Sequence, residues 1–179
     1  MLLLVALVAP ACEKRDTVIS GGMSVSSPAF AKGTHIPKRY AQDPEGENVS
    51  PPLTWSGGPA GTKEWVVIVE DPIPHGALFV HWVLYGIPAS VTSLREGLPA
   101  DEQTVDGLTQ GTNDYGHLGW GGPLPKVGDP VHEFWFWVYA IDTNLKLPPG
   151  ATKAQVFEEL TKGGRHILGN GRTVGSYRR

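Results

Sequence analysis

Two apolar runs separated by a turn-forming stretch are the clearest structural signal in the chain. Trp65–Val69 and Phe79–Ile87 are rich in Val, Ile and aromatic residues, a composition typical of β-strands. The segment between them holds two prolines and a glycine, which favour an extended connection over a helix. The pattern therefore predicts two consecutive strands, with Asp71 at the end of the first and His81 inside the second.

A third run, His132–Asp142, is almost continuously apolar and aromatic. Such a run predicts a central strand buried on both faces, with a second sheet on one side and a helix on the other. Downstream, Thr152 and Gln155 have the spacing of a helix N-terminal capping box. An apolar stripe follows and ends at two glycines, so we predict a helix over residues 152–162.

Shorter segments extend the β pattern toward both ends of the chain. Ser24–Ser26 predicts an opening strand, and Asn48–Trp55 predicts a short strand entered through prolines. Near the C-terminus, Ile167-Leu168 and Thr173–Tyr177 flank Gly169–Gly171, which suggests a closing hairpin. With 23 glycines and 16 prolines as well, the chain is expected to be loop-rich and mainly β.

Length and charge narrow the functional classes. At 179 residues the chain fits one domain with a sizeable core. A formal net charge of −3 gives no basic footprint, which argues against a nucleic-acid partner. The single cysteine, Cys12, can form neither an internal disulfide nor a cysteine-rich metal site.

The N-terminal residues have the pattern of an export signal. Met1–Val8 is apolar but too short to span a bilayer, and Ala9–Ala11 brings small residues directly before Cys12. This pattern resembles a bacterial lipoprotein signal, in which Cys12 would carry the lipid and provide the only membrane contact. The alternative is a loosely packed N-terminus of a cytoplasmic protein. We therefore expect an exported, periplasmic or membrane-anchored protein divided into a signal (residues 1–12), a tether (13–23) and one domain (24–179).

Several sequence blocks, taken together and in order, resemble one known family. They are Asn48–Trp55, Glu70-Asp71-Pro72, His81–Tyr85 with Ile87-Pro88, Gly111–Gly116, Gly121-Gly122-Pro123 with Pro125, His132, Leu168–Gly171 and Val174-Gly175. From about Ser24 to the C-terminus, the chain resembles the phosphatidylethanolamine-binding protein family in its bacterial and archaeal, Raf kinase inhibitor-like branch. The resemblance implies a two-sheet antiparallel Greek-key β-sandwich with a few peripheral helices.

The resemblance also implies a small pocket at one end of the sandwich that takes phosphate, acetate or a phospholipid head group. Asp71, His81 and His132 would form it together with the backbone of Gly122 and Pro123. Histidines held protonated by a carboxylate would supply charge-assisted donors to such an anion, and glycine-rich loop amides would add fixed donors. Further residues that could line this pocket are Trp55, Trp82, His75 and Phe134.

Two departures from the family pattern change the expected pocket. The family usually has a second aspartate where this chain has Ile73, and Arg-Tyr where it has Glu133-Phe134. The pocket would therefore lack one carboxylate and one tyrosine hydroxyl. His75 could add an imidazole at its mouth.

Other interpretations of the same residues remain open. Asp71 and His81 could be only a strand-end acid and a core histidine. A metal-dependent hydrolase could use a ligand set drawn from two histidines and a carboxylate, although no two of the histidines have helical i, i+4 spacing. The candidates are Asp71, His75, His81, His117 and His132. A protein-binding module could present the Gly111–Pro125 loop to a protease or kinase. Phosphate-loop and nucleophile-elbow motifs are absent, so we expect a binding protein without a metal or cofactor, and not an enzyme.

Overall fold

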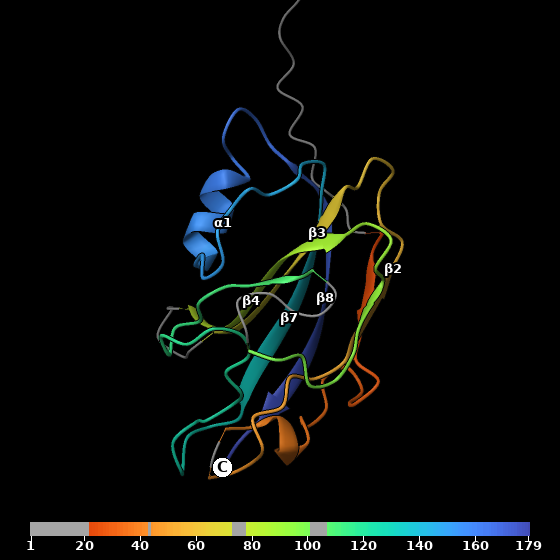
Figure 1. Ribbon diagram of the computed structural model, residues 1–179. Coiled ribbons are helices and arrows are strands. Elements are labelled where there is room, and N and C mark those ends of the chain that lie inside the picture. Colours follow the sequence, from red (N-terminus) through yellow and green to blue (C-terminus); the bar gives the residue numbers. More distant parts are fainter. Residues whose placement is uncertain (1–21, 43, 73–77, 101–106) are drawn as a thin grey trace, which may run out of the picture.

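The computed structural model describes residues 22–42, 44–72, 78–100 and 107–179. Within them, two antiparallel sheets form a sandwich, one with the strand order β1-β2-β5 and one with the order β6-β4-β3-β7-β8 (Figure 1). The mainly β, two-sheet fold predicted above is therefore confirmed. The elements are β1 (Ser24–Ser26), η1 (Lys38–Tyr40), β2 (Leu53–Ser56), β3 (Glu64–Pro72), β4 (Leu78–Pro88), β5 (Ser93–Leu94), β6 (Thr109–Gln110), β7 (His132–Ile141), α1 (Lys153–Glu159) and β8 (Ile167–Tyr177).

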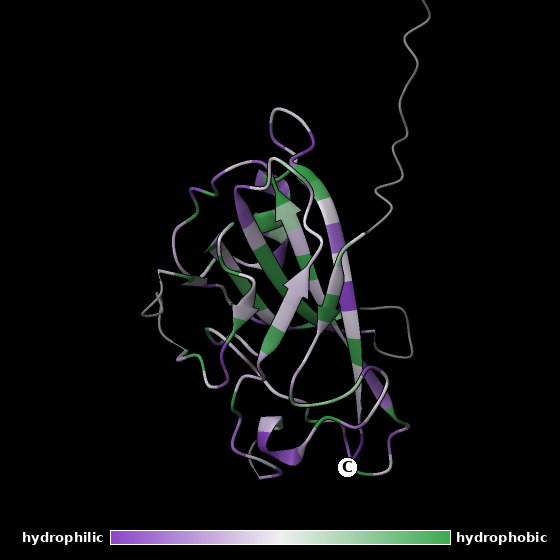
Figure 2. Cartoon of the chain, turned by 90° about the vertical axis from the view of Figure 1, so that its right-hand side faces the viewer, coloured by the Kyte–Doolittle hydropathy of each residue, from purple (hydrophilic) through white to green (hydrophobic). Residues whose placement is uncertain are grey.

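The core lies between the two sheets. Because successive strand residues point to opposite faces, β3 sends Val67 and Val69 into this space, where they pack with Phe134 and Phe136 of β7. Along the middle of the long strand β8, hydrophilic positions alternate in Figure 2 with positions of near-neutral hydropathy, which are mostly glycines. A smaller apolar cluster on the other face of the large sheet packs against α1 through Val156 and other side chains. The large sheet is thus covered on both sides over its centre.

Strand β7 differs from its prediction on one face. Phe134 and Phe136 are at most 1% exposed, but Trp135 and Trp137, which point to the other face, are only half-buried. Helix α1 covers only part of that face, and the Arg172 guanidinium of β8 lies 4.5 Å and 4.8 Å from the two indole ring centroids. The expectation of complete burial on both faces of β7 was therefore wrong.

The predicted C-terminal hairpin is also wrong, because β8 is one continuous strand paired with β7 along its length. The glycines of this stretch allow close packing and do not form a turn. A Cβ atom on Gly171 would lie 2.8 Å from the Met23 carbonyl oxygen and 3.0 Å from a Val25 methyl carbon. Gly171 therefore allows β1 to lie close against β8 at the edge of the sandwich.

Helix α1 begins where the capping box predicted. The Thr152 side chain accepts from the Gln155 backbone N–H, and the Gln155 side chain accepts from the Thr152 N–H. The helix ends at Glu159, earlier than predicted, and turns continue the chain to Gly163. No helix in the described part of the chain is long and apolar enough to cross a membrane. Cys12 and His75 lie outside the described residues.

Candidate functional site

Asp71 lies near the C-terminal end of β3 and is 5% exposed. Alternation along β3 places its carboxylate on the face toward the second sheet, while neighbouring Glu70 points to the helix face and pairs with Lys153 of α1. The Asp71 Oδ2 atom accepts a 2.5 Å hydrogen bond from Nδ1 of His132, the first residue of β7. Oδ1 is buried and has no hydrogen-bond partner among the described residues. The site therefore holds a carboxylate with one satisfied and one free oxygen.

His81 reaches the same region through an irregularity in β4. Val69 pairs with Trp82 and Glu70 pairs with Val80, so one step along β3 corresponds to two steps along β4. This β-bulge leaves His81 as the extra residue, and bulges commonly re-aim a side chain beside a functional site. The ring packs edge-on against Phe134 at 5.0 Å between centroids. The bulge thus turns His81 toward the residues that surround Asp71.

The protonation of His81 differs from the sequence-based expectation. Its Nδ1 donates to the Gly121 carbonyl oxygen at 2.6 Å, and only 3% of the residue is exposed. Burial lowers the pKa of His81 below its usual 6.5, and this effect outweighs the opposing contributions of the Gly121 carbonyl and of the Asp71 charge. His81 is therefore a neutral ring, not the charged donor that proximity to Asp71 suggested.

The Gly111–Pro125 loop is fixed to β4 by hydrogen bonds. The Asn113 Oδ1 atom accepts from the backbone N–H groups of Tyr115 and His117, and its Nδ2 donates to the Gly119 carbonyl. The Gly121 N–H donates to the His81 carbonyl at 2.8 Å. One buried asparagine thus organises the loop that covers His81.

Gly122 and Pro123 lie in this loop, but their backbone groups already have partners. The Gly122 N–H donates to the Asn48 side chain at 2.8 Å, and its carbonyl accepts from Gln42 Nε2. The Pro123 carbonyl accepts from the Gln42 N–H. These two residues therefore shape the site, and the Gly122 amide is not a free donor for a ligand.

Tyr115 brings a phenol into the site that sequence reasoning missed. Its ring lies 4.7 Å from Phe79 and 5.6 Å from His81 between centroids. Burial, together with the nearby Asp71 charge, raises its pKa to about 12, so the hydroxyl keeps its proton at physiological pH. The hydroxyl expected to be missing at Phe134 is thus supplied from the neighbouring loop. Its only sequence signal was the position of Tyr115 in a glycine-rich loop.

The remaining predicted pocket residues separate into two groups. Phe134 packs against His81, and Trp82 lies in the core with its Nε1 donating to Gln110. Trp55 instead contacts Trp65, with ring centroids 5.9 Å apart. Trp65 lies six residues before Asp71 on β3, about 20 Å along an extended strand. The structure therefore places Trp55 at the far end of the sandwich.

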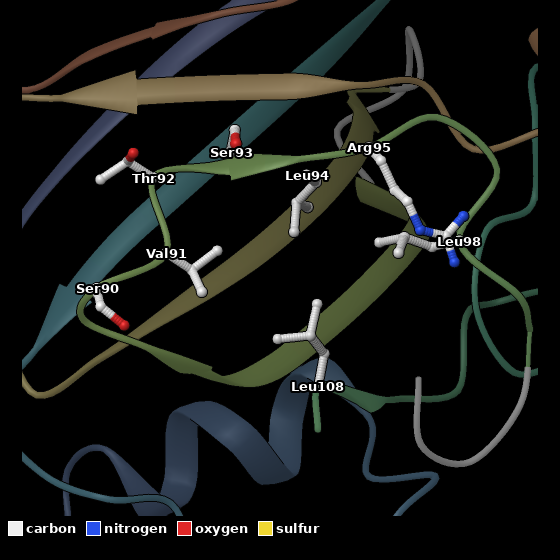
Figure 3. Close-up of a pocket in the computed structure, with 8 residues that line it drawn as sticks. All are labelled: Ser90, Val91, Thr92, Ser93, Leu94, Arg95, Leu98 and Leu108. Carbon is white, nitrogen blue, oxygen red and sulfur yellow. The ribbon is translucent and has the colours of Figure 1, made fainter. Parts of the chain in front are cut away.

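Two hollows lie elsewhere on the molecule, and neither is lined by Asp71, His81 or His132. One, of about 320 Å³, lies beside β5, and Figure 3 shows the side chains of Leu94, Leu98 and Leu108 around it. Arg95 at its edge already donates to the Gly97 carbonyl oxygen at 2.9 Å. The other, of about 460 Å³, lies between α1 and the start of β4. Across the described ranges, no three His, Cys, Asp or Glu side chains are grouped as a metal ion would require.

Comparison with known proteins places the chain in a family. The model of the family described as "Phosphatidylethanolamine-binding protein" matches residues 26–178. The chain belongs to the phosphatidylethanolamine-binding protein family. The resemblance deduced from the sequence blocks is therefore confirmed.

Its relatives come from archaea and bacteria. A UPF0098 protein of Methanothermobacter thermautotrophicus is 42% identical over 157 residues, covering 88% of this chain and 99% of that protein. A Mycobacterium tuberculosis protein named "Putative lipoprotein LppC" is 38% identical over 156 residues, covering 87% of this chain and 72% of the relative. The crystal structure of E. coli YbcL matches with a TM-score of 0.79 at 32% identity, covering 88% of this chain and 98% of YbcL.

Proposed function

We propose that the Asp71–His132 site binds a phospholipid head group of the phosphoethanolamine type, without catalysing a reaction. One observation carries this proposal: the buried Oδ1 of Asp71 has no partner among the described residues. A buried acceptor left unpaired costs about 1–3 kcal/mol or more when charged. The ammonium group of ethanolamine, directly or through a bridging water, is a donor that removes this cost.

The surrounding charges favour a zwitterion over a simple anion. His132 Nε2 faces the Asp129 carboxylate at 3.7 Å, and Asp71 and Asp114 both act on His81. The ion pairs formed by Asp71 and His132 in the described chain include no lysine or arginine. A bare oxyanion would therefore face two carboxylates with no lysine or arginine paired to them within these contacts. The Tyr115 hydroxyl keeps its proton, and its hydrogen bond to the Gly122 carbonyl oxygen is long at 3.5 Å, so it can turn to donate to a phosphate oxygen.

Calorimetric titration with O-phosphorylethanolamine tests this function against ethanolamine and sulfate. We expect the zwitterion to bind most tightly. Asp71→Asn should weaken it about tenfold to a hundredfold, because a charge-assisted hydrogen bond is worth about 1.5–3 kcal/mol. Asp142→Asn is the matched control, since Asp142 follows Ile141, which pairs with Glu64 at the opposite end of β3. Tighter binding of sulfate, or wild-type affinity in Asp71→Asn, would contradict the proposal.

We also propose that the chain is exported and carries lipid on Cys12. The apolar run followed by Ala-Pro-Ala-Cys supports this proposal, as does the lipoprotein name of the Mycobacterium tuberculosis relative. A head-group site on an anchored protein would be held close to its ligand. High local concentration then compensates for modest affinity.

A further inference from the structure

The exposed apolar side chains of the described chain gather at one end of the sandwich. The large hydrophobic residues with high exposure are Val127 at 77%, Val131 at 54% and Leu78 at 45%. Val131 directly precedes His132, and Leu78 pairs with Pro72, the residue after Asp71. Val131 therefore lies beside the Asp71–His132 site, and Val127 lies in a turn whose Asp129 carboxylate faces His132 Nε2 at 3.7 Å. Leu78 instead lines the hollow between α1 and β4.

A tight turn holds one of these side chains in solvent. The Asp129 N–H donates to the Lys126 carbonyl at 3.1 Å, and the Lys126 N–H donates back to the Asp129 carboxylate at 3.0 Å. Gly128 has φ of +91°, as the third residue of a type II turn requires. Val127 is therefore displayed at the tip of a hydrogen-bonded turn. A single exposed valine needs no explanation, but a rigid apolar tip beside a ligand site suggests a contact surface.

The charged residues at this end include both cations and anions. Lys126 and Arg178 are exposed cations, and Asp129 and Glu133 are the nearby acids. Arg178 belongs to this end because β8 finishes at Tyr177, which pairs with His132, and Figure 1 shows the C-terminus beside the start of β7. The mixed charge favours a zwitterionic partner surface over a strongly anionic one.

We propose that Val127 and Val131 form a membrane-docking rim that inserts into a phosphatidylethanolamine bilayer while a head group enters the Asp71–His132 site. Short aliphatic side chains suit the boundary between head groups and acyl chains, where binding strength follows the buried apolar area. The inference rests on the proposed head-group function, because the rim would bring the site to the level of the head groups. It commits to lipid in a bilayer as the source of the ligand, not to a free phosphate compound.

Co-sedimentation with vesicles of phosphatidylethanolamine and phosphatidylcholine tests the rim. The full chain carries Cys12→Ser, so that an attached lipid cannot cause binding. We expect Val127→Asn and Val131→Asn each to weaken partitioning about tenfold, the scale expected for one buried valine. Ala60→Asn is the matched control, since Ala60 is exposed in the turn before β3, at the opposite end of that strand from Asp71.

Titration of the same variants with O-phosphorylethanolamine separates this inference from the proposed function. Val127→Asn and Val131→Asn should bind the soluble compound as the parent does, because neither side chain contributes a polar group to the site. A parent that binds the soluble compound but not vesicles would overturn the rim and leave the head-group function intact. Equal partitioning of the valine variants and the parent would also overturn it. Failure to bind either ligand would overturn the head-group function itself.

Discussion

The neutral state of His81 predicts how the stability of this protein depends on pH. Burial lowers the pKa of His81 in the folded protein, whereas an unfolded histidine titrates near 6.5. Below about pH 6.5 the unfolded chain therefore binds a proton that the native chain excludes, and the free energy of unfolding decreases as the pH falls. This stabilisation is fully present above the pKa of the unfolded histidine. It is lost progressively as the pH falls toward the lower pKa of His81 in the folded protein.

One proton taken up only on unfolding gives a slope of at most about 1.4 kcal/mol per pH unit. Between pH 6.5 and 5.5 the unfolded histidine is about half to nine-tenths protonated, so the integrated loss is at most about 1 kcal/mol, reached when the native ring takes up no proton in this range. His166 works in the opposite direction, because its hydrogen bond to Asp142 raises its pKa. Its stabilising contribution is present at low pH and is lost as the pH rises through its raised pKa, so this residue must be kept the same in all proteins compared.

Urea unfolding of wild type and His81→Gln at pH 5.5, 6.5 and 7.5 isolates the His81 effect. The glutamine amide can still donate a hydrogen bond but does not titrate, and His166 contributes equally to both proteins. We expect the stability difference between the two to shrink by up to about 1 kcal/mol from pH 6.5 to 5.5, because only wild type loses stability through position 81. Parallel pH profiles would show that His81 is not held neutral and would refute the burial argument.

Two further predictions concern the strand β7 and the N-terminus. Phe136→Ala should cost about 3–5 kcal/mol, whereas Trp135→Ala on the half-buried face should cost about 1–3 kcal/mol; equal losses in urea unfolding would mean that the outer face is as dry as the core. Mass spectrometry of the native protein should show loss of residues 1–11 and a lipid on Cys12, and an intact Met1 would rule out that processing.

Much of the fold followed from the apolar runs. β3, β4 and β7 lie where Val, Ile and aromatic residues are concentrated, because buried strands need that composition regardless of their partners. The N-terminal cap of α1 was predictable because Thr152 and Gln155 satisfy each other locally. Features that depend on neighbours in sequence could therefore be read from the sequence.

Features that depend on packing between segments far apart in the sequence could not be read from it. Gly169–Gly171 looked like a turn, but the need for glycine at position 171 comes from Met23 and Val25 across the sandwich. The bulge that re-aims His81 leaves no local pattern, since it arises from how β4 pairs with β3. The sequence correctly suggested that Asp71 favours a charged histidine, but it could not give the depth of burial that reverses the outcome at His81.

The adjacent carboxylates of β3 constrain where the chain can accept insertions. Glu70 pairs with Lys153 on the helix side of the sheet, and Asp71 pairs with His132 on the other side. A one-residue insertion or deletion within the preceding part of β3 would exchange the two faces. Glu70 would then point into the space between the sheets and Asp71 toward α1, and both ion pairs would be lost together. Length changes in the turn before Glu64 would leave the strand register and both ion pairs intact.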